Sequence, residues 1–134
     1  MKFPATAPLE TAKYISLTTF RRDGREVRTP VWFVILGEKL YVMSERDAGK
    51  MKRVRATGKV RFAACDIRGK VRGGWLEGEA RRADGPEVAR QVYGALAAKY
   101  GWTYRISTFL SIISRNIGKR ALLEITPAAP DQSN

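Results

Sequence analysis

The amino-acid sequence predicts a mainly β fold in which antiparallel strands close into a small barrel with short helices beside it. Residues Tyr14–Phe20 alternate apolar and polar side chains, the period of two that is typical of a half-buried strand. Asp23-Gly24 follows, a dipeptide that supplies positive φ in a tight hairpin turn. The second strand, Arg25–Leu36, should therefore run antiparallel to the first. From Val31 onward it is apolar on both faces, which indicates a strand that is covered on both sides.

The rest of the chain alternates between strand and helix patterns. Further strands are expected at Lys39–Met43, Lys59–Asp66, Val71–Arg82 and Arg120–Thr126, and helices at Ala48–Ala56 and Pro86–Tyr100. Ser44 is expected to cap the first helix or to begin the loop before it. An apolar stripe on the second helix should pack on the barrel, and it consists of Val88, Val92, Leu96 and Tyr100. Residues 102–118 contain enough apolar side chains for another helical piece.

A chain of 134 residues fits a single domain, 1–134, in which we expect residues 1–8 and 128–134 to be flexible ends. The longest apolar run, Val31–Leu36, is far shorter than the ~20 residues that a bilayer requires. The N-terminus also lacks the apolar segment of a signal peptide. These features predict a cytoplasmic protein that does not bind membranes.

The residue inventory excludes several kinds of catalytic site. The chain has no histidine, which removes the usual general base and the commonest zinc ligand. Its single cysteine, Cys65, has no partner for an internal disulfide, and its place in a strand predicts a small packed side chain. Catalysis must then rely on carboxylate, lysine, tyrosine or serine side chains, or on a bound cofactor with its own reactivity.

Basic residues outnumber acidic residues by 25 to 13, which gives a formal net charge of +12. A field of this sign attracts polyanions such as nucleic acid, an anionic membrane surface or a phosphorylated small molecule. A solvated basic surface without a specific anion explains the same charge equally well. The distribution of the cations along the chain is therefore more informative than their number.

Cations gather at the start of the short helix that follows the third strand. The first N–H groups of a helix are unpaired, so this end can bind an anion. Met51 and Val54 point the same way on the helix, which places Lys50 beside the buried stripe and turns Lys52 and Arg53 toward solvent. Lys50 is the better candidate for a phosphate contact. A solvated basic helix remains the alternative.

Pro30 interrupts a strand that otherwise has the pattern of a central one. Proline cannot donate to a strand ladder, so it must lie at an edge or a bulge, where free backbone groups could meet a flat heterocycle. Trp32 could add aromatic surface there, and a barrel corner with a core tryptophan fits as well. Gly78, in the middle of the fifth strand, indicates either a bulge or the close approach of a ligand or another backbone.

Four motifs, in this order and at this spacing, resemble the pyridoxamine 5′-phosphate oxidase-like FMN-binding split barrels, and in particular their actinobacterial deazaflavin-dependent oxidoreductase branch. They are Tyr14-Ile15-Ser16-Leu17-Thr18-Thr19-Phe20, Asp23-Gly24 before Arg28-Thr29-Pro30-Val31-Trp32, Leu40-Tyr41-Val42-Met43-Ser44 leading to Gly49-Lys50, and Glu77-Gly78-Glu79-Ala80. The resemblance runs from about Tyr14 to Pro127. It implies a six- to seven-stranded antiparallel split β-barrel.

The resemblance also implies which residues bind the cofactor. The backbone of the second strand borders the ring system, while the loop after the third strand and the basic helix hold the phosphate. The expected cofactor-binding residues are Arg28, Thr29, Pro30, Val31, Trp32, Ser44, Lys50, Lys52 and Arg53. The cofactor lies at a homodimer interface, where Trp75 and Trp102 are candidates for groups from the partner subunit. No metal ligand and no catalytic acid is identified, although Tyr41 or Tyr104 could donate a proton.

The implied activity is that of an oxidoreductase that transfers hydride to or from a small organic substrate. The deazaflavin coenzyme F-420 is favoured over FMN because the carboxylates of its oligoglutamate tail need more positive charge. The motif with which pyridoxamine phosphate oxidases bind substrate phosphate is not recognisable, so vitamin B6 oxidation is not expected. The alternative is a non-catalytic module that binds flavin or nucleic acid. Nucleic acid is the weaker of these because the aromatic strand is too apolar for an open binding face.

Overall fold

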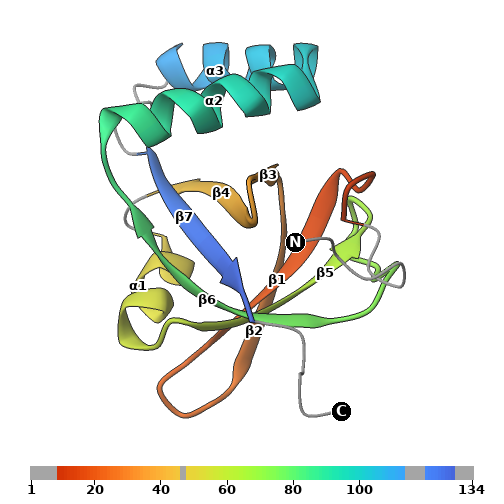
Figure 1. Ribbon diagram of the computed structural model, residues 1–134, viewed down its shortest axis with the longest axis vertical. Helices are drawn as coiled ribbons and strands as arrows, with labels where there is room; N and C mark the ends of the chain where they lie inside the picture. Colours follow the sequence, from red (N-terminus) through yellow and green to blue (C-terminus); the bar gives the residue numbers. More distant parts are fainter. Residues whose placement is uncertain (1–8, 46–47, 114–119, 129–134) are drawn as a thin grey trace.

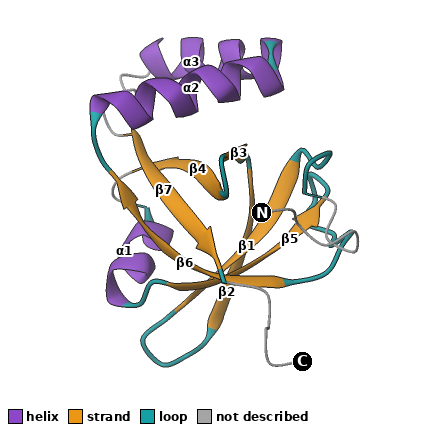
Figure 2. Ribbon diagram, viewed as in Figure 1, coloured by secondary structure: helices purple, strands orange, loops and turns teal. Residues whose placement is uncertain are grey.

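Seven strands and three helices make up the part of the chain that the computed structural model describes, residues 9–45, 48–113 and 120–128 (Figures 1 and 2). The strands are β1 (Tyr14–Phe20), β2 (Glu26–Val31), β3 (Val34–Leu36), β4 (Lys39–Glu45), β5 (Lys59–Cys65), β6 (Leu76–Ala83) and β7 (Arg120–Pro127). The helices are α1 (Gly49–Ala56), α2 (Pro86–Tyr100) and α3 (Trp102–Ile113). The mainly β prediction is confirmed.

The strands form one antiparallel sheet in the order β2-β1-β5-β6-β7-β4-β3. Its two edge strands, β2 and β3, are consecutive in the chain and are joined only by Trp32 and Phe33. Three peptide links span at most about 11 Å, so the sheet must curl until its edges approach each other. Figure 1 shows the resulting half-closed barrel, which is the split barrel expected from the sequence.

The curled sheet separates two hydrophobic cores. The first fills the barrel, where Phe62 and Leu123 are fully buried, and Met51 and Val54 of α1 belong to it. The second lies between the outer face of β3, β4 and β7 and the two helices α2 and α3, which stack above the barrel in Figure 1. Its buried members are Val34, Tyr41, Val92, Leu96, Tyr104 and Leu122. The apolar stripe predicted on α2 therefore packs on the sheet as expected.

The predicted single strand Arg25–Leu36 is wrong, because β2 and β3 lie at opposite edges of the sheet. The apolar pattern of Val31–Leu36 does reflect packing on both sides of the chain. Its cause is the crossover between the two edges of the sheet, and not one long central strand. Phe33 enters the core inside the barrel, whereas the next residue, Val34, enters the core under α2. Consecutive apolar residues here face two different cores.

The end of α2 holds the crossover in place. The hydroxyl of Tyr100 accepts a hydrogen bond from the N–H of Phe33 at 3.0 Å, and its single proton is shared between the carbonyl oxygens of Phe33 at 3.0 Å and Lys13 at 2.8 Å. Burial raises the pKa of Tyr100 to about 12, so this donor keeps its proton. Lys99 donates to the same Phe33 carbonyl at 2.9 Å. The ring of Trp32 stacks on that of Tyr100 with a centroid distance of 4.3 Å. The backbone N–H and carbonyl of Phe33, which lie outside the strands, are thereby satisfied.

Glycines account for two further features. Gly24 has a φ of 89° in the β1–β2 turn, which confirms the predicted hairpin. A Cβ at Gly78 would lie 2.8 Å from the carbonyl oxygen of Thr126. The close approach predicted at Gly78 is therefore to the backbone of β7.

Several predicted boundaries need correction. The fifth strand begins at Leu76 instead of Val71, which forms only an isolated bridge with Cys65. Ser44 neither caps a helix nor begins a loop, because it lies within β4, and Ala48 is the N-cap of α1. Residues 102–113 do form a helix. The ends that we expected to be flexible fall outside the described residues except for Ala128, which donates to Glu77.

We expect Tyr100→Phe to lower the free energy of unfolding by about 1 to 3 kcal/mol, because it leaves a buried N–H without its acceptor. Urea titration measures this loss. Tyr93→Phe is the matched control, since Tyr93 is a half-buried tyrosine of α2 whose hydroxyl has no hydrogen-bond partner among the described residues. Equal stability of the two variants would show that the hydroxyl does not hold the crossover.

Candidate functional site

A cleft of about 260 Å³ lies between the β1–β2 hairpin and the face of α1 that points away from the core. It is lined by Phe20, Arg21, Arg22, Gly49, Lys52, Arg53 and Ala56. Four of these residues are cations, and none of the described residues that line the cleft is acidic. The N-cap Ala48 offers no side-chain oxygen to the first N–H groups of α1. The charges and the helix end favour an anion at this place.

Arg53 is fixed at the inner wall of the cleft. Its Nε donates to Oγ1 of Thr19 at 2.6 Å. A Cβ at Gly49 would lie 2.8 Å from Nη1 of Arg53, so the absence of a side chain at Gly49 leaves room for the guanidinium. The sequence prediction that Arg53 turns toward solvent is wrong, because Thr19, at the end of β1, binds it.

The positive charges in and beside the α1 cleft repel one another. Burial lowers the pKa of the Arg53 guanidinium, and the charge of Arg21 lowers it further. Burial also lowers the pKa of Lys50, as does the charge of Arg53, while Glu45 opposes the shift. Like charges that are held together and partly dehydrated favour a bound anion, because the anion removes the repulsion.

The predicted phosphate residues are only partly brought together. Lys52 and Arg53 line the cleft, and Lys50 lies beside it, close enough to feel the charge of Arg53. Ser44 does not line it. Arg21 and Arg22 do, and the sequence interpretation missed them because it treated the residues around Asp23-Gly24 only as a turn. Two adjacent arginines at a hairpin opposite a basic helix were the available signal.

The residues predicted on β2 alternate between its two faces. Arg28 and Pro30 pair with Thr18 and Ser16 on the outer face, whereas Thr29 and Val31 pair with the core residues of β1. Pro30 lies on an edge strand, as its missing N–H required. Trp32 follows at the crossover, where one side of its ring is covered by Tyr100.

The outer face of β1, β2 and β5 carries an aromatic and cationic cluster around Trp75. The guanidinium groups of Arg28 and Arg61 lie 5.0 and 5.1 Å from the Trp75 ring centre. Beneath them, Oγ1 of Thr18 and Nε of Arg61 are buried without a hydrogen-bond partner among the described residues. The α1 cleft is lined by none of these residues. Trp102, the other candidate, is 77% exposed on α3.

Neither tyrosine considered as a proton donor lines the cleft. Tyr104 is buried in the core under α2. Tyr41 donates to Oε2 of Glu124 at 3.0 Å, and burial together with this carboxylate raises the pKa of Tyr41. Cys65 is buried as expected, and burial raises the pKa of its thiol. No catalytic acid can therefore be assigned among these residues.

Glu124 is a buried carboxylate that accepts hydrogen bonds from three side chains, two of them cationic. Besides Tyr41, Arg81 donates to it at 2.9 Å and Lys39 at 3.3 Å. Burial alone would raise the pKa of Glu124, but the hydrogen bonds from Arg81, Tyr41 and Lys39 outweigh it and lower the pKa. This network joins β4, β6 and β7 on the outer face of the sheet.

A split barrel with a basic cleft beside a short helix defines the class of this protein. A family model described as pyridoxamine 5′-phosphate oxidase matches residues 5–133, so the chain belongs to this family. A search among curated proteins finds no match. Among the described residues, no helix is long and apolar enough to cross a membrane, and no cluster of histidine, cysteine and acidic side chains could hold a metal ion.

Solved structures share the fold at low sequence identity. The heme storage protein HutZ of Vibrio cholerae has 15% identity and a TM-score of 0.68, over 90% of this chain and 85% of HutZ. A conserved hypothetical protein of Mycobacterium tuberculosis has 18% identity and a TM-score of 0.69, over 96% and 87%. A NimC/NimA family protein of Clostridium acetobutylicum has 20% identity and a TM-score of 0.60, over 88% and 74%. These similarities concern the fold alone.

We expect Glu124→Gln to lower stability at pH 7 by about 1.5 to 3 kcal/mol, because it replaces a carboxylate that accepts from charged donors. Since the pKa of Glu124 is lowered in the folded state, its contribution is present above the unfolded value of about 4.3 and is lost as the pH falls through the folded value. Urea unfolding at several pH values should therefore show the variant and the parent converging in acid.

The control for this experiment is Glu26→Gln. Glu26 pairs with Arg28 at 3.3 Å, but both side chains are exposed, so its removal should change stability by less than about 1 kcal/mol. A Glu124→Gln variant that is no less stable than the control at neutral pH would mean that the network stabilises nothing.

Proposed function

We propose that the protein is an oxidoreductase that binds the deazaflavin coenzyme F-420, or FMN in its place, and transfers hydride to or from a small organic substrate. The α1 cleft is the observation that carries this proposal. Arg21, Arg22, Lys52 and Arg53 gather there, and none of the described residues that line the cleft with them is acidic, which suits a phosphate-bearing cofactor. Membership of a family named for an oxidase supports the same class of chemistry.

In this proposal one part of the chain binds the phosphate of the cofactor and another part binds its ring system. The cofactor phosphate would lie against α1, held by Lys50, Lys52 and Arg53. The ring system would border the backbone from Arg28 to Trp32. The bound cofactor supplies the hydride chemistry, which no side chain of the protein offers. The protein binds and orients it and keeps water from the reacting centre.

The number of cations favours the deazaflavin over FMN. Lys50, Lys52 and Arg53 already exceed what one phosphate needs, and Arg21 and Arg22 extend the positive surface toward the hairpin. The glutamate carboxylates of an F-420 tail match this surplus, whereas FMN ends at its phosphate. Absorbance of the purified protein and quenching of added F-420 fluorescence distinguish the two cofactors.

We propose a homodimer, with groups from the second copy completing the cofactor site. Trp102, Ile106 and Leu110 recur every four residues on α3 and are 77%, 56% and 57% exposed. An apolar stripe of this kind is usually covered in the assembled protein. The Trp75 cluster is the other surface that a second copy would cover, and it contains the Thr18 hydroxyl, which has no hydrogen-bond partner among the described residues.

Two other functions give different results in the same assays. A non-catalytic flavin-binding module would take up the cofactor and fail to reduce any acceptor. A nucleic-acid-binding module would bind short RNA with a steep salt dependence and no cofactor. HutZ shares the fold and is a heme storage protein, but this chain has no histidine, so a haem would need another axial ligand.

We expect Lys50→Ala and Lys52→Ala each to weaken cofactor binding about tenfold to a hundredfold, because each removes a charge-assisted phosphate contact worth roughly 1.5 to 3 kcal/mol. Fluorescence titration of F-420 and of FMN measures the dissociation constants. Lys70→Ala, an exposed lysine in the turn after β5, is the control and should bind like the parent.

The fold of each variant is checked by its unfolding transition, since Lys50 is partly buried next to Met51, whereas Lys52 is exposed. If both α1 variants retain the parental affinity while Lys70→Ala also binds normally, the phosphate site lies elsewhere. If the parent binds neither coenzyme but binds RNA, the oxidoreductase proposal fails.

We expect Ile106→Glu to convert a dimer into a monomer at micromolar concentration, because it places a charge in the apolar stripe of α3. Sedimentation velocity gives the oligomeric state. Ile67→Glu is the matched control, since Ile67 is 68% exposed and lies in the turn between β5 and β6. A parent protein that is monomeric with cofactor bound would contradict a site shared between subunits.

A further inference from the structure

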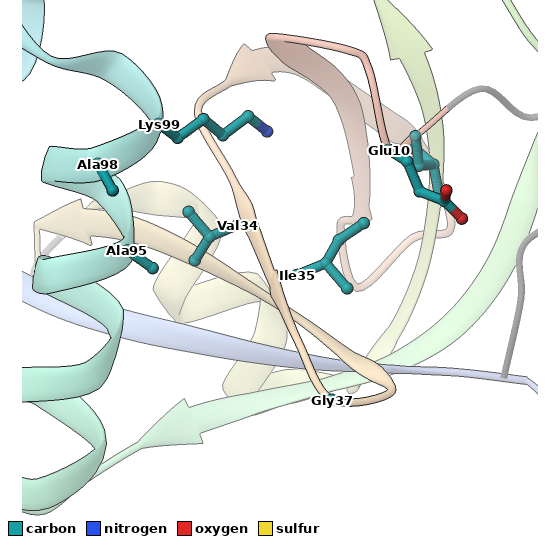
Figure 3. Close-up of a pocket in the computed structure, with 8 residues that line it drawn as sticks. Glu10, Val34, Ile35, Gly37, Ala95, Ala98 and Lys99 are labelled. Carbon is teal, nitrogen blue, oxygen red and sulfur yellow. The ribbon is translucent and has the colours of Figure 1, made fainter.

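A second cavity, with a volume of about 600 Å³, lies between α2 and β3 (Figure 3). It is more than twice as large as the α1 cleft and is within the size range of sites for small organic molecules. The residues that line it are Leu9, Glu10, Val34, Ile35, Gly37, Ala95, Ala98 and Lys99. Its walls are thus mainly aliphatic, with one cation and one anion.

The cation, Lys99, is only partly satisfied by the protein. Its Nζ donates to the Phe33 carbonyl at 2.9 Å and lies 3.5 Å from the centre of the Phe33 ring. An ammonium group has three donors, and no carboxylate among the described residues lies within ion-pair distance of this one. Burial lowers the pKa of Lys99 to about 8. By contrast, the amine of Lys39 pairs with Glu124.

The anion, Glu10, lies across the cavity from Lys99, as Figure 3 shows. The two side chains form no ion pair, and Val34, Ile35 and Ala98 supply apolar surface around the space between them. Glu10 repels negative charge at its own end. An anionic ligand must therefore carry its charge at the Lys99 end and present an apolar body to the rest.

The charge count decides between classes of anion. One cation opposed by one carboxylate suits a single negative charge, whereas a phosphate dianion is better matched by the four cations of the α1 cleft. A neutral ligand would make no charge-assisted hydrogen bond with the amine of Lys99. A monocarboxylate of mainly apolar structure is the ligand that satisfies all of these conditions.

We propose that this cavity binds a small, mainly apolar carboxylic acid, with its carboxylate on the amine of Lys99 and its ring or chain against Val34, Ala95 and Ala98. The acid is the substrate only if the proposed function holds, so that part of the proposal rests on it. Lys99 contacts Phe33, which adjoins Trp32, a residue expected to border the cofactor ring. The cavity therefore lies beside the proposed reaction site.

The test uses the full chain without added cofactor and two probes of equal shape, naphthoate and naphthamide, in calorimetric titrations. Naphthoate should bind the parent at least tenfold more tightly than naphthamide, because only the carboxylate pairs with the ammonium. Lys99→Gln should abolish this difference by weakening naphthoate alone. Lys70→Gln is the matched control and should preserve it. Equal binding of both probes to the parent, or none, overturns the proposal.

Lys99→Gln could disturb the crossover through the Phe33 carbonyl, so a second variant avoids that contact. Ala98 is an exposed residue of α2 that lines the cavity, and Ala98→Glu adds a negative charge there without removing a hydrogen bond. It should weaken naphthoate at least tenfold and leave naphthamide nearly unchanged. If Ala98→Glu weakens neither probe, they bind elsewhere and the proposal is wrong.

Dependence on pH gives an independent readout. The titratable groups around the amine are Glu10 across the cavity and Tyr100 on the same helix, whose pKa is about 12. Among the described residues that line the cavity, Lys99 is the one that loses its charge between about pH 7 and pH 9, so naphthoate affinity should fall and naphthamide affinity should not. A pH-independent affinity for naphthoate would contradict the pairing with Lys99.

These results can be separated from those on the cofactor. If naphthoate binds as expected while neither F-420 nor FMN binds, the cavity is a carboxylic-acid site and the proposed oxidoreductase function fails. If a coenzyme binds and naphthoate does not prefer the parent, the function survives and the acid site is wrong.

Discussion

The fold depends on how the backbone of Phe33 is satisfied. The chain passes from one edge of the sheet to the other in two residues, Trp32 and Phe33, and a segment of this kind has no strand neighbours to accept or donate hydrogen bonds. The end of α2 supplies them through the Tyr100 hydroxyl and the Lys99 amine. Without these contacts, the curling of the sheet would leave polar groups unpaired at the edge of both cores. The position of α2 over the sheet and the closure of the barrel are consequently one structural feature.

The sequence predicted those elements whose signals are local. Strand β1 and the Gly24 turn follow from alternation and from turn chemistry, and Pro30 required an edge position. The crossover could not be predicted, because the apolar pattern of Val31–Leu36 fits a strand buried on both faces as well as a chain that enters two cores in succession. Tyr100 belonged to a predicted apolar stripe, yet its hydroxyl acts on a residue 67 positions away. Periodicity contains no information about such a contact.

In the candidate site, too, the local features could be predicted from the sequence and the long-range contacts could not. The basic helix was visible in the sequence because its cations lie close together along the chain. Arg53, however, turns back to Thr19, and Arg21 and Arg22 reach the same cleft from a hairpin. Their meeting depends on the curl of the sheet and on the position of α1. A glycine at position 49 could have suggested that another group packs closely against the backbone there. The sequence alone does not show that this group is the Arg53 guanidinium. Lys99 is a similar case, since a lysine near the end of a helix is usually explained by the helix dipole alone.

The surplus of basic residues is arranged in two different ways. On the outer face of β4, β6 and β7, the buried carboxylate of Glu124 accepts from Arg81 and Lys39, so cations there have a partner and the group is structural. At the α1 cleft none of the described lining residues is acidic. Burial and mutual repulsion lower the pKa values of Arg53 and Lys50, and the charge of Glu45 opposes the shift of Lys50 only in part. Folding could have neutralised these cations with a carboxylate, as it does at Glu124. A cluster that remains uncompensated and partly dehydrated lowers the stability of the unliganded protein, and a bound anion recovers that energy. The contrast between the two sites, more than the net charge of +12, is why an anionic cofactor is the better explanation of the basic sequence.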